Sequence, residues 1–245
     1  MASQSRRPFL LTRPARQGAR FAAALRQRFG EGIRLVTSPL LAPLFLRPEL
    51  PVGAATLIFT SETGVEAFRR ISAEQPQTAH CAWCVGERTA EAARAAGLST
   101  RSADGDAEAL VAQILAAGEA GPLLHLRGAE TRGEVAKRLT EAGIPATEAV
   151  VYDQRPQPLS DEALALLRGP EPVIAPLFSP RTAALLTAEL RLRAPGAPLW
   201  VAALSPAVAS AAAPLQPARS QTAARPDAAS LIAAIVALID AESPA

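Results

Sequence analysis

Residues 173 to 186 read VIAPLFSPRTAALL, an apolar run that stops on Ser-Pro and continues as an alanine-rich segment. Residues 200 to 213 repeat this pattern as WVAALSPAVASAAA, and LIFTSETGVEAF (57 to 68) and CVGERTAEAA (84 to 93) are looser copies. Short apolar runs separated by helical stretches of about 10–15 residues are typical of parallel βαβ units. The sequence therefore predicts an α/β fold in which strands and helices alternate along the chain.

The copies recur at a nearly constant spacing, which indicates two homologous α/β units. Three strand-to-helix junctions form pairs at offsets of 118, 119 and 121 positions: Ser61 with Ser179, Gly86 with Ser205, and Asp106 with Asp227. Between residues 40 and 51 the proline-rich stretch LLAPLFLRPELP interrupts the alternation, and its pattern predicts a connector.

The residue types at these junctions suit helix starts that face a ligand. A serine at a helix N-cap accepts a hydrogen bond from an unpaired backbone N–H group, and proline fits the next position because it lacks that group. The remaining N–H groups would point into the crevice at the carboxyl edge of a parallel sheet, where anions bind. We expect six such positions: Thr12-Arg13-Pro14, Ser61, Gly86, Gly128, Ser179-Pro180 and Ser205-Pro206. The alternative is that each is only a well-capped turn.

Length and composition narrow the function classes. The chain has 245 residues, of which 49% are hydrophobic and 20% charged, as in ordinary globular proteins. A net charge of +2, a single lysine (Lys137) and 4% aromatic residues argue against a nucleic-acid partner. The segment SRRPFLL (5 to 11) begins like a twin-arginine signal, but Thr12 and Arg13 end its apolar run after three residues. With no stretch of about 18 apolar residues either, we expect a cytoplasmic protein without a membrane segment.

Side chains that could bind a cofactor or act as a nucleophile are sparse. Cys81 and Cys84 form a C-x-x-C pair in HCAWCVG, which reads as a buried strand. Because strand residues i and i+3 face opposite sides, we interpret both as packing residues and not as metal ligands. His80 and His125 have no ligand-like spacing and are interpreted as structural or surface residues. No P-loop, nucleophile elbow or HExxH motif occurs. The residues alone indicate a two-domain α/β protein that binds an anionic small molecule without a cofactor.

An ordered set of motifs along the chain resembles the uroporphyrinogen-III synthase family. These motifs are LLTRP (10 to 14), LIFTSETGVEAF, CVGERTAEAARAAGL (84 to 98), DAEALVAQI (106 to 114), LLHLRGAETRGEVAKRLTEAG (123 to 143) and EAVVYDQRP (148 to 156). The resemblance covers about residues 9 to 238. It implies two flavodoxin-like parallel-sheet domains joined by a two-stranded linker, with the active site in the interdomain cleft. The expected domains are 1–37 plus 156–245 and 44–148, with linker strands 38–43 and 149–155.

The same resemblance implies a cofactor-independent cyclising lyase of tetrapyrrole (haem, sirohaem, cobalamin, chlorophyll) biosynthesis. The family closes hydroxymethylbilane to uroporphyrinogen III, with loss of water and inversion of ring D. Tyr152 matches the family's active-site tyrosine, a candidate acid for the departing hydroxyl. The positions on cleft-edge motifs are candidate substrate contacts: Arg13, Ser61, Thr63, Gly86, Thr89, Arg127, Ser179 and Ser205.

The chain also departs from the family pattern in its last third. Leu177-Phe178-Ser179 stands where the family commonly reads FTS, and residues 205 to 209 (SPAVA) replace a GPTTA-type turn. Both changes remove a threonine hydroxyl from the predicted cleft. The rival hypothesis is a non-catalytic module of two α/β lobes that binds an anionic small molecule. In either case we expect a monomer, without a metal, nucleic acid or membrane partner.

Overall fold

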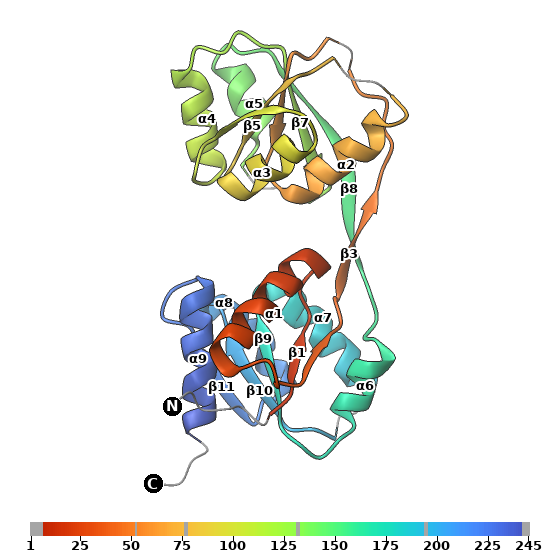
Figure 1. The fold of residues 1–245 in the computed structure, drawn as a ribbon, viewed down its shortest axis with the longest axis vertical. Helices are drawn as coiled ribbons and strands as arrows, with labels where there is room; N and C mark the ends of the chain where they lie inside the picture. Colours follow the sequence, from red (N-terminus) through yellow and green to blue (C-terminus); the bar gives the residue numbers. More distant parts are fainter. Residues whose placement is uncertain (1–6, 52, 76–77, 131–132, 194–195, 242–245) are drawn as a thin grey trace. The chain divides into compact units, whose positions relative to one another are not determined.

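The chain folds into two compact units (Figure 1). The computed structural model describes residues 7–51, 53–75, 78–130, 133–193 and 196–241. The first unit combines the chain up to Ala42 with the chain from Pro156 onward, and the second unit runs from Pro43 to Arg155. In the described part of the chain, no helix is both long and apolar enough to span a membrane.

The first unit contains a five-stranded parallel sheet in the order β11-β10-β9-β1-β2. Numbered along the unit and read from the β2 edge, this is the order 2-1-3-4-5 of flavodoxin. Its strands are β1 (Phe9–Leu11), β2 (Leu35–Thr37), β9 (Val173–Leu177), β10 (Leu199–Ala203) and β11 (Arg219–Thr222). Its helices are α1 (Ala15–Phe29), α6 (Asp161–Leu167), α7 (Pro180–Arg191), α8 (Pro206–Ala212), the short 3₁₀ helix η1 (Ala213–Leu215) and α9 (Ala228–Asp240).

Helices cover both faces of this sheet, which explains the apolar runs in the sequence. Successive strand residues point to opposite faces, so Val201 packs with α6, α7 and α8 while Trp200 packs with α1 and α9. Every residue of β9 and β10 is buried. Strands buried on both faces have continuous apolar sequences and not alternating ones, as in VIAPL and LWVAA.

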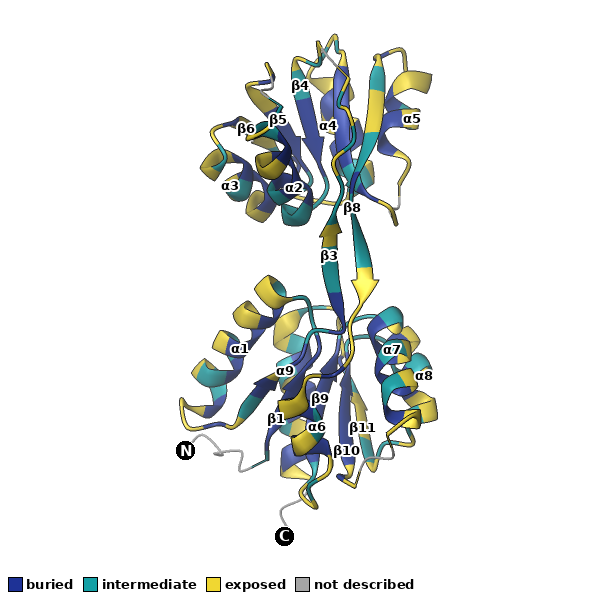
Figure 2. Cartoon of the chain, turned by 90° about the vertical axis from the view of Figure 1, so that its right-hand side faces the viewer, coloured by how far each residue is buried: buried dark blue, intermediate teal, exposed yellow. Residues whose placement is uncertain are grey.

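The second unit contains a six-stranded sheet in the order β3-β8-β7-β4-β5-β6. Its strands are β3 (Leu41–Phe45), β4 (Thr56–Phe59), β5 (Cys81–Cys84), β6 (Ser99–Ser102), β7 (Leu123–Gly128) and β8 (Ala146–Pro156). Its helices are α2 (Glu62–Ser72), α3 (Glu87–Ala95), α4 (Ala107–Ala116) and α5 (Val135–Glu141). Phe59 packs with α2 and α3 on one face, and Ile58 packs with α4 and α5 on the other. Figure 2 shows the buried strands of each unit between helices whose outer faces are exposed.

The two sheets share one spatial order, as the internal repeat predicts. The matched junctions pair β4, β5 and β6 with β9, β10 and β11, which leaves β7 and β8 to match β1 and β2. With these matches, β6-β5-β4-β7-β8 and β11-β10-β9-β1-β2 are the same order. The units differ in connectivity, because β1 and β2 open the chain whereas their counterparts close the second unit. The repeat is therefore circularly permuted.

Strand β3 lies in a stretch that the proline pattern predicted to be a connector, and that prediction is wrong for Leu41–Phe45. The strand overlaps the linker strand 38–43 implied by the family resemblance, but it begins and ends later. The strand tolerates Pro43 because it lies at the edge of its sheet, where a missing N–H group is not needed for pairing. Directly after the strand, Leu46 N donates to Val151 O of β8 (2.9 Å). Just beyond the two strand ends, Gln157 N donates to Leu40 O (3.0 Å), and the pairing is antiparallel.

Strand β8 is longer than the linker strand 149–155 implied by the family resemblance. Its first residues pair in parallel with β7, beginning at Leu123 with Ala146. This pairing makes the first half of β8 a regular strand of the second unit's sheet. The boundary between the units, at Arg155 and Pro156, falls at its end.

The helix starts have the predicted capping chemistry at Ser61, Ser179 and Ser205 but not at the other three expected positions. Pro14, the N-cap of α1, and Gly86, the N-cap of α3, make no side-chain cap hydrogen bond. Gly128 ends β7, and the N-cap of α5 is Glu134. The side chain of the N-cap residue accepts a hydrogen bond from a backbone N–H group at Ser61, Asp106, Ser179, Ser205 and Asp227. Pro180 and Pro206 occupy the first helical turn, as their missing N–H groups allow. Each cap stabilises its helix by about 1 kcal/mol. These caps fix where each chain segment leaves the carboxyl edge of its sheet.

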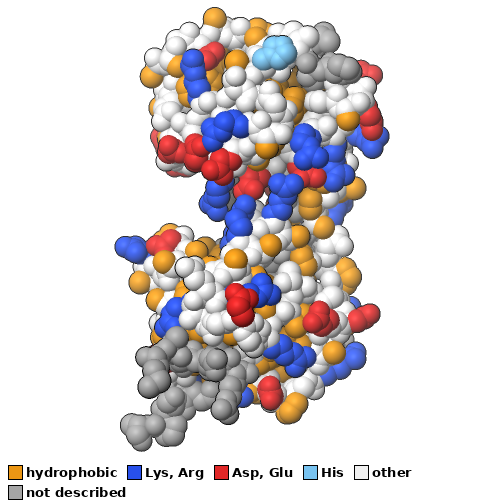
Figure 3. Space-filling view, viewed as in Figure 1, with side chains coloured by type: hydrophobic (Ala, Val, Ile, Leu, Met, Phe, Trp, Pro, Cys, Tyr) orange, Lys and Arg blue, Asp and Glu red, His pale blue; other side chains and the backbone are white. Residues whose placement is uncertain are grey.

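Charged side chains of both signs are interspersed over the face of the molecule seen in Figure 3. Many form exposed ion pairs, such as Arg47 with Glu74 (2.7 Å). The single lysine, Lys137, pairs with Glu134 (3.3 Å) on the surface of α5, and its side chain is 61% exposed. Lys137 therefore lies on a solvated helix face. Exposed pairs of this kind contribute about 1 kcal/mol or less each.

Candidate active site

The candidate residues of the second unit gather at one edge of its sheet. Strands β4, β5, β7 and β8 are mutually parallel, so their carboxyl ends lie at the same edge. Ser61 and Gly86 follow β4 and β5, and Gly128 ends β7. Tyr152 is level with Gly128 on β8. This edge is the position at which open parallel sheets bind ligands.

Ser61 hydrogen-bonds to both α2 and Tyr152. As the N-cap of α2, its Oγ accepts a hydrogen bond from Gly64 N (3.1 Å). The same oxygen lies 2.9 Å from Tyr152 Oη, within hydrogen-bond distance. Two residues 91 positions apart are thereby joined by their hydroxyl groups. The phenol of Tyr152 is thus held beside the positive end of a helix.

The ring of Tyr152 rests on Gly128. An added β-carbon at Gly128 would lie 2.7 Å from Cζ and 3.0 Å from Oη of the tyrosine. The register of β7 and β8 shifts between Arg127 and Gly128, and beyond the shift Ala129 N donates to Tyr152 O (2.8 Å). Tyr152 as a whole is half-buried.

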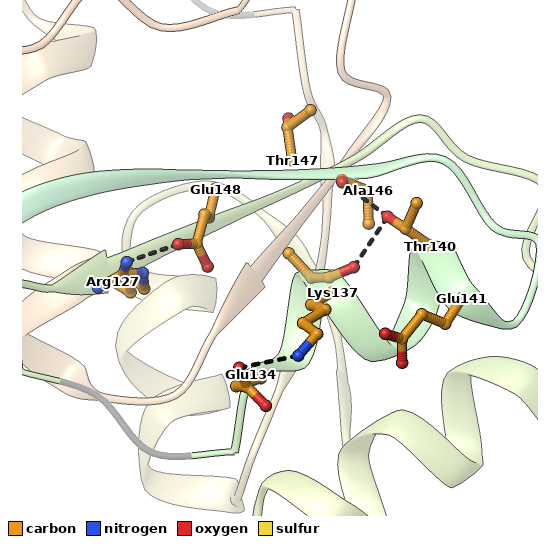
Figure 4. A pocket seen from close by; sticks show the side chains of 9 residues that line it. Arg127, Glu134, Lys137, Thr140, Glu141, Ala146, Thr147 and Glu148 are labelled. Carbon is orange, nitrogen blue, oxygen red and sulfur yellow. Dashed lines mark hydrogen bonds and ion pairs between the residues drawn. The ribbon is translucent and has the colours of Figure 1, made fainter.

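Arg127 is held by several acceptors at the carboxyl end of β7. Its Nη2 donates to Glu148 Oε1 (2.5 Å), and its Nη1 donates to Gly128 O (2.9 Å) and Ala129 O (3.3 Å). The hydrogen bond from Arg127 holds the pKa of the Glu148 carboxyl below its usual range. Figure 4 shows this pair on the wall of a cavity of about 480 Å³ between β8 and α5. Within the described residues, the buried Nε of Arg127 has no hydrogen-bond partner.

His125 lies in β7, three residues before Gly128, and is fully buried. Burial lowers its pKa from 6.5 to about 4, so the imidazole is neutral near pH 7. Its Nε2 is 3.2 Å from Thr60 Oγ1, and its Nδ1 has no partner among the described residues. The interpretation of His125 as a structural residue is consistent with this burial. His80, by contrast, is exposed.

The other candidates of the second unit occupy the first turns of two helices. Thr63 is half-buried in the first turn of α2. Gly86 is the N-cap of α3 and adopts an extended backbone (φ −162°). Thr89 lies in the first turn of α3, and only 6% of it is exposed. Contact of these residues with a substrate stays a prediction.

In the first unit, the candidates lie at the corresponding sheet edge. Arg13 follows β1, and its guanidinium carbon lies 3.8 Å from the centre of the Phe178 ring. Ser179 caps α7, and its Oγ accepts from Thr182 N (3.1 Å) and lies 2.9 Å from Thr182 Oγ1. Ser205 caps α8 through Val208 N (3.4 Å). Within this unit, Arg13 and Ser179 flank Phe178.

Strand register shows that Arg13 and Arg127 occupy equivalent positions in the two units. Ile174 of β9 pairs with Phe9 of β1. Subtracting the repeat offset of 118 from position 174 gives Thr56, which pairs with Leu123 of β7. Phe9 is therefore equivalent to Leu123, an offset of 114, and the same offset relates Arg13 to Arg127. Each unit thus places one arginine at the end of the same strand.

The two cysteines are not equivalent. Cys84 is buried in the core with α2 and α3, whereas Cys81 is exposed, so the prediction of a packing role is wrong for Cys81. As the first residue of β5, Cys81 lies at the amino end of its strand, where its neighbours cover it less. Burial raises the pKa of the Cys84 thiol from 9.0 to about 12. The described residues include no group of three or more His, Cys, Asp or Glu side chains placed to hold a metal ion.

Together these features describe a class of protein: a duplicated α/β protein with a polar edge on each sheet. In the second unit that edge carries a phenol, a serine hydroxyl, free helix N-terminal N–H groups and an arginine. Such groups can donate hydrogen bonds to carboxylates and a proton to a leaving oxygen.

Comparison with known proteins identifies the family. A family model described as uroporphyrinogen-III synthase HemD matches residues 20–233, so the chain belongs to the uroporphyrinogen-III synthase family. Among solved structures, uroporphyrinogen-III synthetase from Helicobacter pylori 26695 matches with a TM-score of 0.60 and 17% identity, over 95% of this chain and 99% of that one. A mutant uroporphyrinogen-III synthase from the extremely thermophilic bacterium Thermus thermophilus matches with a TM-score of 0.50 and 14% identity, over 96% of this chain and 100% of that one. A search of curated proteins gave no match.

Membership of this family makes the chain a cyclising, lyase-type enzyme. The two structural matches have the same α/β fold, in agreement with the predicted fold class. At 14–17% identity they show the fold alone and do not identify site residues.

Three features of the site were not predicted from the sequence. These are the hydrogen bond between Ser61 and Tyr152, the contact of the tyrosine ring with Gly128, and the ion pair of Arg127 with Glu148. The sequence holds one signal for the ion pair of Arg127 with Glu148. Each is a charged residue in an apolar, strand-like segment, and the two segments follow one another along the chain. The other two depend on the register of β8, which no motif specifies.

Proposed function

We propose that this chain converts hydroxymethylbilane to uroporphyrinogen III, with loss of water and inversion of ring D, in tetrapyrrole biosynthesis. The observation that carries this proposal is the family match over residues 20–233. The phenol at the sheet edge, joined to Ser61, supports it with chemistry that the reaction requires. We further propose that the enzyme works as a cytoplasmic monomer, without a cofactor, nucleic acid or membrane partner.

In this proposal Tyr152 is the acid of the reaction. Hydroxide is a poor leaving group, and a positioned acid typically accelerates its departure by about 10²–10⁴-fold. Tyr152 is half-buried, and its hydroxyl is hydrogen-bonded to Ser61, so the phenol oxygen has a fixed position. Because hydroxymethylbilane also loses water and cyclises unaided, the enzyme's larger task is to orient the chain.

Substrate-binding candidates come from both units, and they suit the eight carboxylates of hydroxymethylbilane. In the second unit these are Ser61, Thr63, Gly86, Thr89 and Arg127; in the first they are Arg13, Ser179 and Ser205. Arginine binds carboxylates through two parallel hydrogen bonds, and N–H groups at helix N-termini add further donors. The equivalence of Arg13 and Arg127 supports one arginine contact in each unit.

The decisive experiment is to incubate the purified protein with freshly generated hydroxymethylbilane and to separate the oxidised porphyrin isomers. We expect the type III isomer, also after treatment with excess chelator. Formation of only the spontaneous type I isomer would leave the non-catalytic anion-binding module as the better interpretation. Loss of activity with chelator would contradict the cofactor-free mechanism.

Replacement of the phenol tests its role within the same assay. We expect Tyr152→Phe to lower kcat by roughly 10- to 100-fold, toward the lower end of the range for an acid catalyst. The product stays mainly type III, because the binding groups still hold the substrate. A kcat close to that of the wild type, with chemistry rate-limiting, would assign Tyr152 a packing role.

A further inference from the structure

We propose that Ser61 is a positioning residue for Tyr152. The hydroxyl of Ser61 donates a hydrogen bond to Tyr152 Oη and directs the phenol proton outward. This inference rests on the proposed function, and it replaces direct substrate contact as the main role of the Ser61 hydroxyl. It follows from the 2.9 Å contact between the two oxygens and from what else each residue touches.

The direction of this hydrogen bond is inferred from the position of Ser61 at the start of α2. A serine hydroxyl has one proton to donate and two lone pairs to accept with. One lone pair accepts from Gly64 N at 3.1 Å, and among the described residues Tyr152 Oη is the other polar atom hydrogen-bonded to Ser61 Oγ. The N-terminus of α2 also creates a positive potential at this point. That potential favours the electron-rich phenol oxygen facing Ser61, with the phenol proton turned away.

The tyrosine ring is held so that its oxygen stays at Ser61. On one side the ring packs against Gly128, where an added β-carbon would approach Cε2 to 2.8 Å. The tyrosine backbone is fixed by the hydrogen bond from Ala129 N to Tyr152 O (2.8 Å). Ser61 itself is fixed by its capping bond at the start of α2. The phenol oxygen therefore has a defined position before a substrate binds, which reduces the reorganisation needed for catalysis.

This geometry assigns Ser61 a part in the proton transfer. When the C–O bond of the hydroxymethyl group breaks, its electron pair leaves with the oxygen, which takes the phenol proton and departs as water. The substrate keeps a cationic carbon, and the phenolate oxygen keeps the hydrogen bond from Ser61. Closure with inversion of ring D then forms two C–C bonds to that ring and breaks one, and transfer of one ring proton to the phenolate restores the phenol. Ser61 stabilises the charge on Tyr152 between these two steps.

A set of matched variants tests the proposal. Ser61→Ala removes both the cap and the donor, Ser61→Gly removes the donor but keeps most of the helix stability, and Ser61→Thr keeps both. Ser160→Ala is the control for loss of a serine cap, because Ser160 caps α6 through Ala163 N (3.3 Å) and belongs to no proposed site. Each variant is also combined with Tyr152→Phe.

The expected kinetic result is a loss of kcat that depends on the phenol. Removal of one hydrogen bond to the reacting group lowers kcat by about three- to tenfold in Ser61→Ala and Ser61→Gly, with little change in KM. Ser61→Thr retains most of the activity, and Ser160→Ala retains all of it. In the Tyr152→Phe background the same serine changes have little further effect, since coupled residues are not additive.

A spectroscopic measurement reads the hydrogen bond directly. Tyr152 is the only tyrosine of the chain, so the tyrosine Fermi doublet in the Raman spectrum reports on this phenol alone. The wild-type doublet should have the intensity ratio of a phenol that accepts a hydrogen bond. Ser61→Ala and Ser61→Gly should change this ratio, and Ser160→Ala should not.

A spectroscopic result or a kinetic result would overturn the proposal. One is an unchanged Fermi doublet in both serine variants, which would show that Ser61 does not donate to Tyr152. The other is a rise in KM with unchanged kcat, or full additivity with Tyr152→Phe, which would make Ser61 a substrate contact. Failure of the proposed function has a different signature, because the wild type would then yield no type III isomer although the Raman change persists.

Discussion

A side chain at position 128 and the ring of Tyr152 would need the same space, since an added β-carbon at Gly128 would lie 2.7 Å from Tyr152 Cζ. Real β-carbons essentially never approach another heavy atom so closely. The absence of a side chain at the end of β7 is thus a condition for the position of the phenol on β8. The position of the tyrosine ring therefore depends on a glycine, a residue that carries no functional group.

We therefore expect Gly128→Ala to displace the tyrosine ring. Overpacking of this kind costs about 1–3 kcal/mol of unfolding free energy, and a shift of about 1 Å in a catalytic group lowers kcat by up to about 10²-fold. Steady-state kinetics and chemical denaturation measure the two effects. Gly32→Ala is the matched control, because an added β-carbon there meets no atom within 4 Å and the backbone is not left-handed. Wild-type kcat in Gly128→Ala would show that the ring position is not important for catalysis.

Arg127 is the next test, because its guanidinium is already bound to Glu148 and to the carbonyl of Gly128. If it also binds a substrate carboxylate, Arg127→Ala should raise KM by about tenfold or more while kcat falls less, since uniform binding is lost. Added salt should weaken substrate binding in the wild type and less so in the variant, because salt screens exposed charge pairs. The measurement is KM at several salt concentrations.

Glu148→Gln is the companion variant to Arg127→Ala. It removes the charge that competes for the guanidinium, so KM should stay the same or fall. An unchanged KM in Arg127→Ala would place this arginine outside the binding site. Its contacts would then serve only to hold the strand ends of β7 and β8 together.

The sequence predicts the fold well where strands are buried and poorly where they are exposed. The runs VIAPL and LWVAA are apolar because helices cover both faces of β9 and β10, so their pattern identifies them as strands. Strand β11, RSQT, has no apolar residue and was not predicted, because it lies at the edge of its sheet with its middle residues exposed. Its pairing with β10 is a tertiary contact that local sequence does not specify.

The sequence predicts which edge of the sheet carries the candidate site, but it does not predict the contacts between the residues of the site. Capping patterns place Ser61 at the start of a helix, and the family resemblance selects Tyr152, but their 2.9 Å contact depends on the register shift next to Gly128. The equivalence of Arg13 and Arg127 was hidden for another reason. A search at a constant offset finds pairs 118–121 positions apart, in which the residue of the second unit precedes that of the first. The permuted connectivity reverses this order for the arginines, because Arg13 of the first unit precedes Arg127 of the second.

The cysteines offer a test of the strand orientation at β5. Cys81 is exposed, whereas Cys84 is buried and its pKa is raised to about 12, so its thiol stays protonated at neutral pH. Thiolates are the reactive form of cysteine. We expect iodoacetamide to modify Cys81 in the native protein and to modify Cys84 only after unfolding. Peptide mass spectrometry of the native and denatured reactions measures this, and rapid native modification of Cys84 would contradict the assigned burial.

His125 makes the stability of the second unit sensitive to acid. Burial lowers its pKa from 6.5 to about 4 in the folded state, so below pH 6.5 the unfolded chain binds a proton that the folded chain does not. Folding stability from this residue is present above about pH 6.5 and is lost as the pH falls toward 4. Each pKa unit corresponds to about 1.36 kcal/mol, so the loss between pH 7 and pH 5 is about 2 kcal/mol.

The variant His125→Gln isolates this contribution, because glutamine does not titrate and is able to keep a hydrogen bond to Thr60. Each unit contains one tryptophan, Trp83 in the second and Trp200 in the first. In a Trp200→Phe background, urea unfolding followed by tryptophan fluorescence reports on the second unit. Between pH 7 and pH 5 the free energy of unfolding should fall by about 2 kcal/mol more with His125 than with glutamine, since the titrating carboxylates are common to both proteins. Equal losses would mean that His125 takes up its proton in the folded state, and that its imidazole is more accessible to water than its burial indicates.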